Sequence, residues 1–167
     1  MRTLSFFVSL FLMVALVGCG GSDTETSDTA TESATSSATE AVSDVTIEPA
    51  GNQMKYEQTE FTVEAGTEVS LTFNNTATSP AMKHNVVILT GTGDDVVQRV
   101  GEAAMQAAGN DYVPEDDAVL AATGLADPGE KVSMTFTAPS EPGTYKFICT
   151  FPGHYMMMQG TMRVVAG

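Results

Sequence analysis

Side chains that bind soft metal ions are gathered near the C-terminal end of the sequence. Cys149 and His154 lie five positions apart with a Pro-Gly pair between them, and Met158 follows four positions later. A loop of this length can fold back so that a thiolate, an imidazole and a thioether meet at one point. The only other histidine, His84, lies 65 residues before Cys149 and opens an apolar run. One cysteine, two histidines and a weakly bound methionine make up the donor set of a blue copper site.

This donor set suits an ion that changes its oxidation state. Thiolate and thioether ligands favour Cu(I), and imidazole suits both Cu(I) and Cu(II). A trigonal plane of one sulfur and two nitrogens lies between the geometries that the two ions prefer. Little rearrangement then accompanies the gain or loss of an electron. The residues therefore predict one type 1 copper ion per chain, which cycles between Cu(II) and Cu(I).

Each of these residues has a simpler interpretation when it is taken alone. A buried cysteine is usually a small apolar side chain, a histidine is usually satisfied by hydrogen bonds, and methionines usually fill a core. A Cys–His pair also fits a thiol nucleophile, although a tight Pro-Gly loop is an unusual setting for one. Zinc accepts both residue types, but a catalytic zinc site normally has a harder or an additional ligand. The joint spacing favours copper over these alternatives.

The N-terminal segment is predicted to be a lipoprotein signal rather than part of a fold. Arg2 precedes an apolar run over residues 4–16, which is too short to span a membrane comfortably. The sequence Leu-Val-Gly-Cys that ends at Cys19 fits cleavage before a cysteine that is then acylated, although an ordinary signal peptide can also contain a cysteine. We expect a signal peptide over residues 1–18 and a lipid on Cys19 that anchors the chain to a membrane.

Composition divides the rest of the chain into a tether and a folded domain. Residues 19–43 consist almost entirely of small, hydroxyl and acidic residues, which predicts a disordered acidic tether. Residues 44–167 form the predicted domain and hold 16 acids and six bases, a formal charge of −10 within the total of −14. This charge argues against a nucleic-acid partner, which needs a basic face, and favours fast docking of basic partners.

The domain is predicted to be β-structure with one helix. Short segments alternate apolar and polar residues between turn signals, as half-buried strands do. We expect strands over residues 45–48, 54–56, 61–63, 69–73, 85–89, 132–137, 143–149 and 160–165. Residues 94–108 instead place apolar side chains at helical spacing before the stop signal Gly109-Asn110, which predicts a helix of about 12–16 residues. Short, evenly spaced strands indicate a sandwich or a barrel.

The sequence Cys-Thr-Phe-Pro-Gly-His, followed after three residues by a methionine, is the signature of the azurins. The chain resembles these cupredoxins and the related auracyanins over most of residues 44–166, including the segments Gly-Asn-Gln-Met at 51–54 and Met-Lys-His-Asn at 82–85. This resemblance implies an all-β Greek-key β-sandwich of about eight strands with one helical flap insertion. It also implies three strong copper ligands and one axial ligand, which are His84, Cys149, His154 and Met158.

The resemblance assigns further residues to the site. The backbone carbonyl of Lys83 is a weak additional ligand, although azurins have glycine there, and the backbone N–H groups of Asn85 and Phe151 donate to the cysteine sulfur. Electrons pass through the edge of His154, within an apolar patch formed by Met54, Met82, Pro152, Gly153, Met156 and Met157. The N-terminal disulfide and the non-ligand histidine of azurins have no counterpart in this sequence.

These observations predict a one-electron carrier and not an enzyme, because every position around the metal is filled and none is left open for a substrate. The expected partners are redox proteins that donate and accept electrons in transient complexes, with no nucleic acid and no small-molecule substrate. The expected location is the bacterial cell envelope, with the domain facing the periplasm or the exterior. The alternative is a periplasmic copper-binding and delivery module, which the methionine cluster and the acidic tether also fit.

Overall fold

The computed structural model describes residues 40–167, and the predicted signal peptide, Cys19 and the tether up to residue 39 lie outside the described residues. Eight strands occur in chain order, with a helix and a short 3₁₀ helix after the fourth. They are β1 (Asp44–Ile47), β2 (Glu60–Glu64), β3 (Glu68–Asn74), β4 (Val87–Leu89), α1 (Asp94–Ala104), η1 (Ala108–Asn110), β5 (Val119–Ala122), β6 (Lys131–Thr137), β7 (Gly143–Ile148) and β8 (Gln159–Val165).

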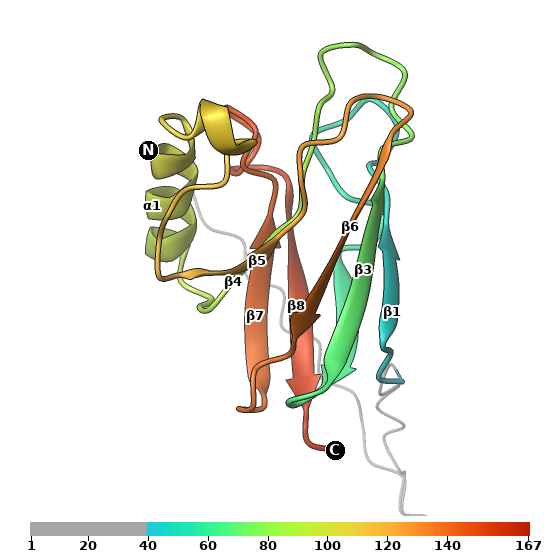
Figure 1. Cartoon of the computed structure of the whole chain (residues 1–167), viewed down its shortest axis with the longest axis vertical. Helices are drawn as coiled ribbons and strands as arrows, with labels where there is room; N and C mark the ends of the chain where they lie inside the picture. Colours follow the sequence, from blue (N-terminus) through green and yellow to red (C-terminus); the bar gives the residue numbers. More distant parts are fainter. Residues whose placement is uncertain (1–39) are drawn as a thin grey trace, which may run out of the picture. The chain divides into compact units, whose positions relative to one another are not determined.

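The strands form two sheets that face each other (Figure 1). The smaller sheet has the order β1-β3-β6, and the larger sheet has the order β2-β8-β7-β4-β5. β1 pairs with β3 and β2 pairs with β8 in parallel, whereas the other pairs are antiparallel. The predicted Greek-key β-sandwich of about eight strands with one helix is therefore confirmed.

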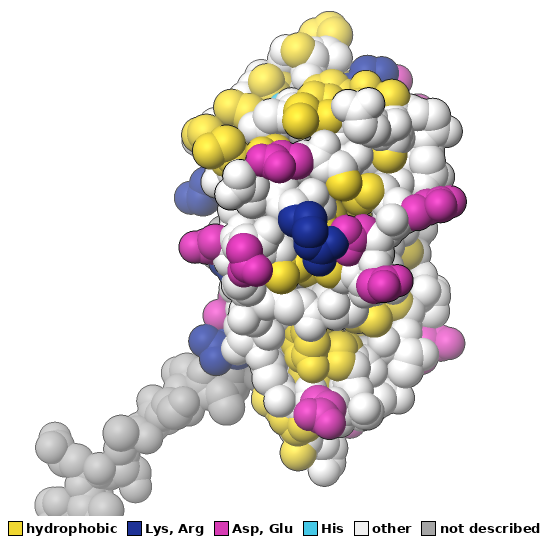
Figure 2. Space-filling model, turned by 90° about the vertical axis from the view of Figure 1, so that its left-hand side faces the viewer, with side chains coloured by type: hydrophobic (Ala, Val, Ile, Leu, Met, Phe, Trp, Pro, Cys, Tyr) yellow, Lys and Arg dark blue, Asp and Glu magenta, His cyan; other side chains and the backbone are white. Residues whose placement is uncertain are grey.

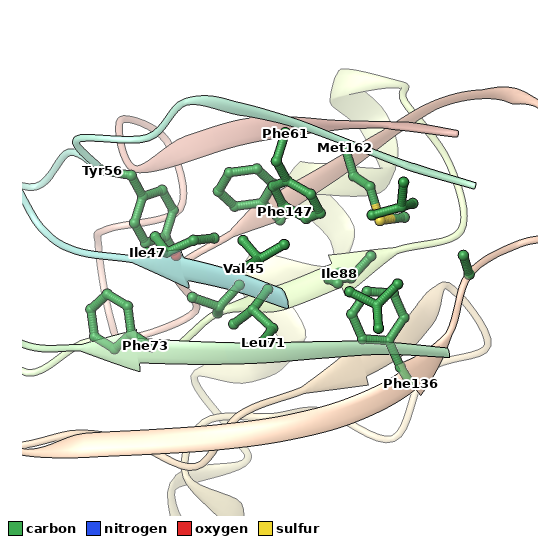
Figure 3. Close-up of a cluster of buried hydrophobic side chains, with 14 of the residues drawn as sticks. Val45, Ile47, Tyr56, Phe61, Leu71, Phe73, Ile88, Phe136, Phe147 and Met162 are labelled. Atoms are coloured by element: carbon green, nitrogen blue, oxygen red, sulfur yellow. The ribbon is translucent and has the colours of Figure 1, made fainter. Parts of the chain in front are cut away.

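The core lies between the sheets because strand residues alternate between the two faces of each sheet. The burial of β3 follows this period, with Val69, Leu71 and Phe73 fully buried and the intervening residues exposed or half-buried. Figure 3 shows aromatic and aliphatic side chains from both sheets pointing into the same layer. Phe147 of β7 lies there with its ring 5.2 Å from that of Tyr56 and 5.4 Å from that of Phe61.

The predicted helix is present but shorter than expected. α1 has 11 residues, and its acidic residues Asp94 and Asp95 stand in the first turn, where they complement the helix dipole. Val97 and Val100 pack with Leu89 and Ile148 in a second apolar cluster outside the main core. None of the helices within residues 40–167 has both the length and the hydropathy that crossing a membrane requires.

Two strand predictions differ from the structure. Residues 54–56 are not a strand: they lie in a turn region, with a single bridge between Pro49 and Tyr56. The prediction was wrong because Tyr56 is buried as a core aromatic, which looks like strand alternation in a short window. β5 was missed because its four residues are all half-buried and show no alternation.

The domain has two distinct ends. β1 begins opposite Ser70, near the start of β3, and β3 ends at Asn74. The next residue, Asn75, donates its side-chain N–H to the carbonyl of Met82, two positions before His84. The chain therefore enters the domain at the end remote from His84. Figure 1 shows this lower end, where β1 starts and where the C-terminus lies.

Candidate metal centre

The predicted ligands come from three places in the sequence and meet at one end of the sandwich. His84 precedes β4 and is bridged to Ala126 by two backbone hydrogen bonds of 3.2 and 2.9 Å. Cys149 directly follows β7, and Met158 directly precedes β8. His154 lies in the loop between these two strands. Because β7 and β8 are paired along their length, the ends of this loop are held together by the sheet.

Three ligand atoms converge tightly. Nδ1 of His84 lies 3.1 Å from Nδ1 of His154. Sγ of Cys149 lies 3.7 Å from Nδ1 of His84 and 3.6 Å from Nδ1 of His154. A point equidistant from three such atoms lies about 2 Å from each, which is the length of a metal–nitrogen bond. The residues present therefore fit a metal ion bound by one sulfur and two imidazole nitrogens.

The orientation of the His84 ring is consistent with this role. Its ring is fully buried, and within residues 40–167 its Nε2 has no hydrogen-bond partner. Its Nδ1 faces the other two ligand atoms, so a proton on Nε2 leaves the Nδ1 lone pair free for a metal. Met158 is also fully buried and belongs to the same core cluster as Cys149.

The surroundings favour the neutral form of each metal-free ligand. Burial raises the pKa of the Cys149 thiol to about 12, although the backbone N–H groups of Asn85 and Phe151 act against this rise. Burial and, to a smaller extent, the neighbouring His154 lower the pKa of His84 to about 4. Burial also lowers the pKa of His154. Both imidazoles are therefore neutral at pH 7 and able to bind a metal.

The loop from Cys149 to Met158 is closed by its own backbone. The N–H of Cys149 donates to the carbonyl of Met158 at 3.0 Å, and the N–H of Met158 donates to the carbonyl of His154 at 2.8 Å. The N–H of His154 donates to the carbonyl of Phe151 at 3.0 Å. Gly153 has φ +83°, a conformation that other residues adopt rarely, so the Pro-Gly pair is what permits this tight turn.

Asn85 joins the segment after His84 to the segment after Cys149. Its side-chain oxygen accepts from the backbone N–H of Thr150 at 2.8 Å, and its side-chain nitrogen donates to the carbonyl of Asp111 at 3.0 Å. Its own carbonyl accepts from the hydroxyl of Tyr56 at 2.7 Å. The bonds to Thr150 and Tyr56 are buried and shielded from water, whereas the bond to Asp111 is partly buried.

Sequence reasoning missed several residues that support the site. Asn75, Tyr56 and Thr150 were not identified, because their partners are 7 to 65 positions away and leave no local pattern. Asn75 donates to the carbonyls of both Met82, two positions before His84, and Ala126, the bridge partner of His84. The one available signal was that a polar residue, Asn75, directly follows a strictly alternating strand.

The residues of the predicted electron-transfer patch lie around the metal end. His154 is 5% exposed whereas His84 is 0% exposed, so His154 is the histidine nearer to the surface. Met156 and Met157 are exposed, as are Pro152 and Gly153, and a pocket of about 350 Å³ is lined by Met54, Met82 and Met157 together with Asn52, Gln53 and Lys55. Figure 2 shows hydrophobic side chains gathered toward the upper end of the molecule, with acidic side chains spread below them.

The chain is similar to known proteins over the whole described domain. A family model for copper binding proteins of the plastocyanin/azurin family matches residues 43–165. Auracyanin-A of Chloroflexus aurantiacus is 39% identical over 124 residues, which cover 72% of this chain and 74% of that protein. Outer membrane protein H.8 of Neisseria meningitidis is 42% identical over 102 residues, which cover 59% of this chain and 54% of that protein.

Solved structures agree with the sequence comparison. Reduced auracyanin from the photosynthetic bacterium Roseiflexus castenholzii matches with a TM-score of 0.70 and 42% identity, over 75% of this chain and 99% of that chain. Auracyanin A of Chloroflexus aurantiacus, described as a "blue" copper protein, matches with a TM-score of 0.67 and 38% identity, over 73% of this chain and 98% of that chain.

The converging donor atoms, the sandwich fold and these matches lead to one conclusion. The chain belongs to the plastocyanin/azurin family of copper-binding proteins, and His84, Cys149, His154 and Met158 form a type 1 copper site that serves electron transfer.

Proposed function

We propose that this protein carries single electrons between redox proteins associated with a bacterial membrane, while a lipid on Cys19 holds it at that membrane. The observation that carries the proposal is the convergence of Sγ and two Nδ1 atoms in a buried, backbone-closed loop. His84, Cys149, His154 and Met158 would hold the copper ion, and the weak Lys83 carbonyl would complete its surroundings. This supports a carrier rather than an enzyme, because no position is left open for a substrate.

The chain's own residues prepare the site for electron transfer. Copper supplies the chemistry, since it accepts one electron as Cu(II) and releases it as Cu(I). Asn85 and Thr150 hold the two ligand segments in register, so the donor atoms are in place before metal arrives. The backbone N–H groups of Asn85 and Phe151 face the sulfur and stabilise its thiolate form.

Lys83 stands at a position of this site where the azurins have glycine. We assign its backbone carbonyl as a weak additional ligand, because it immediately precedes His84. Its side chain is paired with Asp127 at 2.6 Å, and Asp127 follows Ala126, the bridge partner of His84. The ion pair therefore spans the same two segments as the backbone bridge and supports the position of this carbonyl.

Electron exchange through the edge of His154 is supported by its position nearest the surface. The surrounding residues Met54, Met82, Pro152, Gly153, Met156 and Met157 offer an apolar contact area. Flexible methionine side chains adapt to different partner surfaces, which suits short-lived complexes with more than one redox protein.

Visible absorption after addition of Cu(II) to the unlipidated protein, starting at residue 20, tests this proposal. We expect an intense blue band from thiolate-to-copper charge transfer, which a reductant bleaches and an oxidant restores. The Cys149→Ser variant is the control and should lack the band. A protein that binds copper without this band, and that passes its copper readily to a chelator, would instead favour the delivery module.

The lipid anchor and the envelope location need a separate test. The similarity to outer membrane protein H.8 supports an envelope location. In bacteria that express the full chain, labelled palmitate should be incorporated into the protein and the protein should sediment with membranes. The Cys19→Ser variant should lose both the label and the sedimentation. An unlabelled wild-type protein in the soluble fraction would contradict the anchor without affecting the copper site.

A further inference from the structure

The loop from Cys149 to Met158 contacts α1 where the side chain of Tyr155 covers Gly101. Tyr155 immediately follows His154, and Gly101 is a buried residue near the C-terminal end of α1. A Cβ atom placed on Gly101 would lie 2.2 Å from Cγ of Tyr155 and within 2.5 Å of both adjacent ring carbons. The ring therefore rests directly on the helix backbone.

Glycine inside a helix needs an explanation, because it costs about 1 kcal/mol relative to alanine at such a position. The contact with Tyr155 supplies the explanation, since no residue with a side chain leaves room for the ring. Gly109 of the neighbouring η1 shows the contrast, because a Cβ atom placed on it would have no atom within 4 Å. Gly101 therefore destabilises α1 slightly but leaves the space that the Tyr155 ring of the loop occupies.

Beside this contact, the helix and the loop are separated. A groove of about 450 Å³ is lined on one side by Asp94, Val97, Gln98 and Glu102 of α1 and on the other by Tyr155, Met156 and Gln159. Figure 2 views the molecule from the side on which Figure 1 places α1. Tyr155 lines this groove and also packs against the apolar cluster that contains Val97 and Val100 of α1, so its side chain connects α1 to the loop.

The loop transmits the position of Tyr155 to two copper ligands. The side chain of Gln159 donates to the carbonyl of Tyr155 at 2.9 Å, and the N–H groups of Met157 and Met158 both donate to the carbonyl of His154. A displacement of the Tyr155 ring thus acts on a short turn that contains His154 and Met158. A side-chain carbon normally approaches a ring carbon to about 3.5–4 Å, so a methyl group on Gly101 would displace the ring by roughly 1.3 Å or more.

We propose that Gly101 and Tyr155 are positioning residues for the copper site: α1 sets the position of His154 and Met158 through the contact between the Gly101 backbone and the Tyr155 ring. α1 then helps to hold the copper ligands in position, in addition to covering one side of the sandwich. A change at this point of α1, outside the ligand loop, alters the ligand geometry.

Backbone amide NMR shifts of the metal-free Gly101→Ala variant test the proposal without copper. We expect large shifts for residues 149–158, far above those in the Gly109→Ala variant, which is the matched control. In the copper-loaded proteins, Gly101→Ala should also change the reduction potential and the ratio of the charge-transfer bands, while Gly109→Ala should leave both unchanged. The NMR comparison needs no copper, so it tests the positioning role even if the proposed carrier function is wrong.

Removal of the ring provides the decisive comparison. In the double variant Gly101→Ala/Tyr155→Ala the new methyl group meets no ring, so its loop shifts and potential should equal those of Tyr155→Ala alone. If Gly101→Ala is too unstable to study, the double variant should nevertheless fold. Loop shifts in Gly101→Ala that match those of the Gly109→Ala control would overturn the proposal. So would a double variant that differs from Tyr155→Ala as much as Gly101→Ala differs from the unchanged protein.

Discussion

Each strong copper ligand is held in surroundings that disfavour its charged form in the absence of metal. Burial raises the pKa of Cys149 to about 12 and lowers the pKa of His84 to about 4. At pH 7 the thiol therefore keeps its proton and both imidazoles are neutral. Metal binding must remove one proton from the site, and that proton comes from Cys149.

Copper affinity is accordingly predicted to depend on pH with a simple slope. Between about pH 7, above the lowered pKa values of both histidines, and about pH 11, below the raised pKa of Cys149, one proton leaves for each copper ion bound. The affinity should rise about tenfold for each pH unit in this range. Competition with a chelator of known pH dependence measures the slope. A slope near zero would mean that the thiol is already ionised in the metal-free protein.

The amide of Asn85 is predicted to stabilise the metal-free fold. Asn85→Ala leaves the buried N–H of Thr150 and the carbonyl of Asp111 without this partner, so we expect a loss of about 2–4 kcal/mol in the free energy of unfolding. Urea denaturation without copper measures it. Asn110→Ala is the control: this exposed side chain donates to the carbonyl of Val113, where water can replace it, so its loss should stay below about 1 kcal/mol. Equal losses in the two variants would contradict this role.

At the scale of the elements, the sequence predicted the structure wherever a pattern was local. The alternation of apolar and polar residues predicted β3, and the helical spacing of apolar residues predicted α1, because each element is long enough to show its period. The copper ligands were predictable because Cys149, His154 and Met158 share one loop and His84 is the only remaining histidine. β5 and the support by Asn75 and Tyr56 were not predictable, since they depend on contacts between distant segments.

The pairing of β7 with β8 contains a second glycine that an aromatic ring covers. Gly160 stands opposite Phe147, and a Cβ atom on it would lie 2.0 Å from Cζ of that ring. Gly160→Ala is therefore predicted to overpack the core and to lower the free energy of unfolding by about 1–3 kcal/mol. Thermal denaturation of the metal-free protein checks this, with Gly143→Ala in β7 as the control, where a Cβ atom would make an ordinary 3.7 Å contact. An equally small effect of both substitutions would show that the Phe147 ring adapts freely.

The whole molecule carries a strongly negative charge around a partly apolar metal end. Within residues 44–167, 16 acids outnumber six bases. Three of the bases are paired with acids in the ion pairs Lys83–Asp127, Arg99–Asp116 and Arg163–Glu60. A net charge of this size attracts cations over distances comparable to the Debye length and repels anions. Small redox reagents of opposite charge should therefore respond oppositely to salt.

This expectation concerns the rate at which the reduced copper protein is oxidised. With tris(1,10-phenanthroline)cobalt(III), a cation, the rate should fall at least about threefold when ionic strength rises from 10 mM to 500 mM. With hexacyanoferrate(III), an anion, it should rise over the same range. Stopped-flow absorbance at the blue band measures both. The same direction for both reagents would mean that the surface next to His154, and not the net charge, controls their approach.

The chain enters the domain at the end remote from His84. If the N-terminal side is attached to a membrane, this position leaves the copper end exposed to redox partners. The proposed anchor upstream of residue 40 would pull on the segment before β1, where the N–H of Val42 donates to the carbonyl of Thr62. That bond and the pairing of β1 with β3 would bear the load at this end, away from the ligand segments. The copper end would then stay free to rotate toward a partner. If the chain instead entered the domain beside the copper site, the attached segment would occupy the surface that electron donors and acceptors must contact.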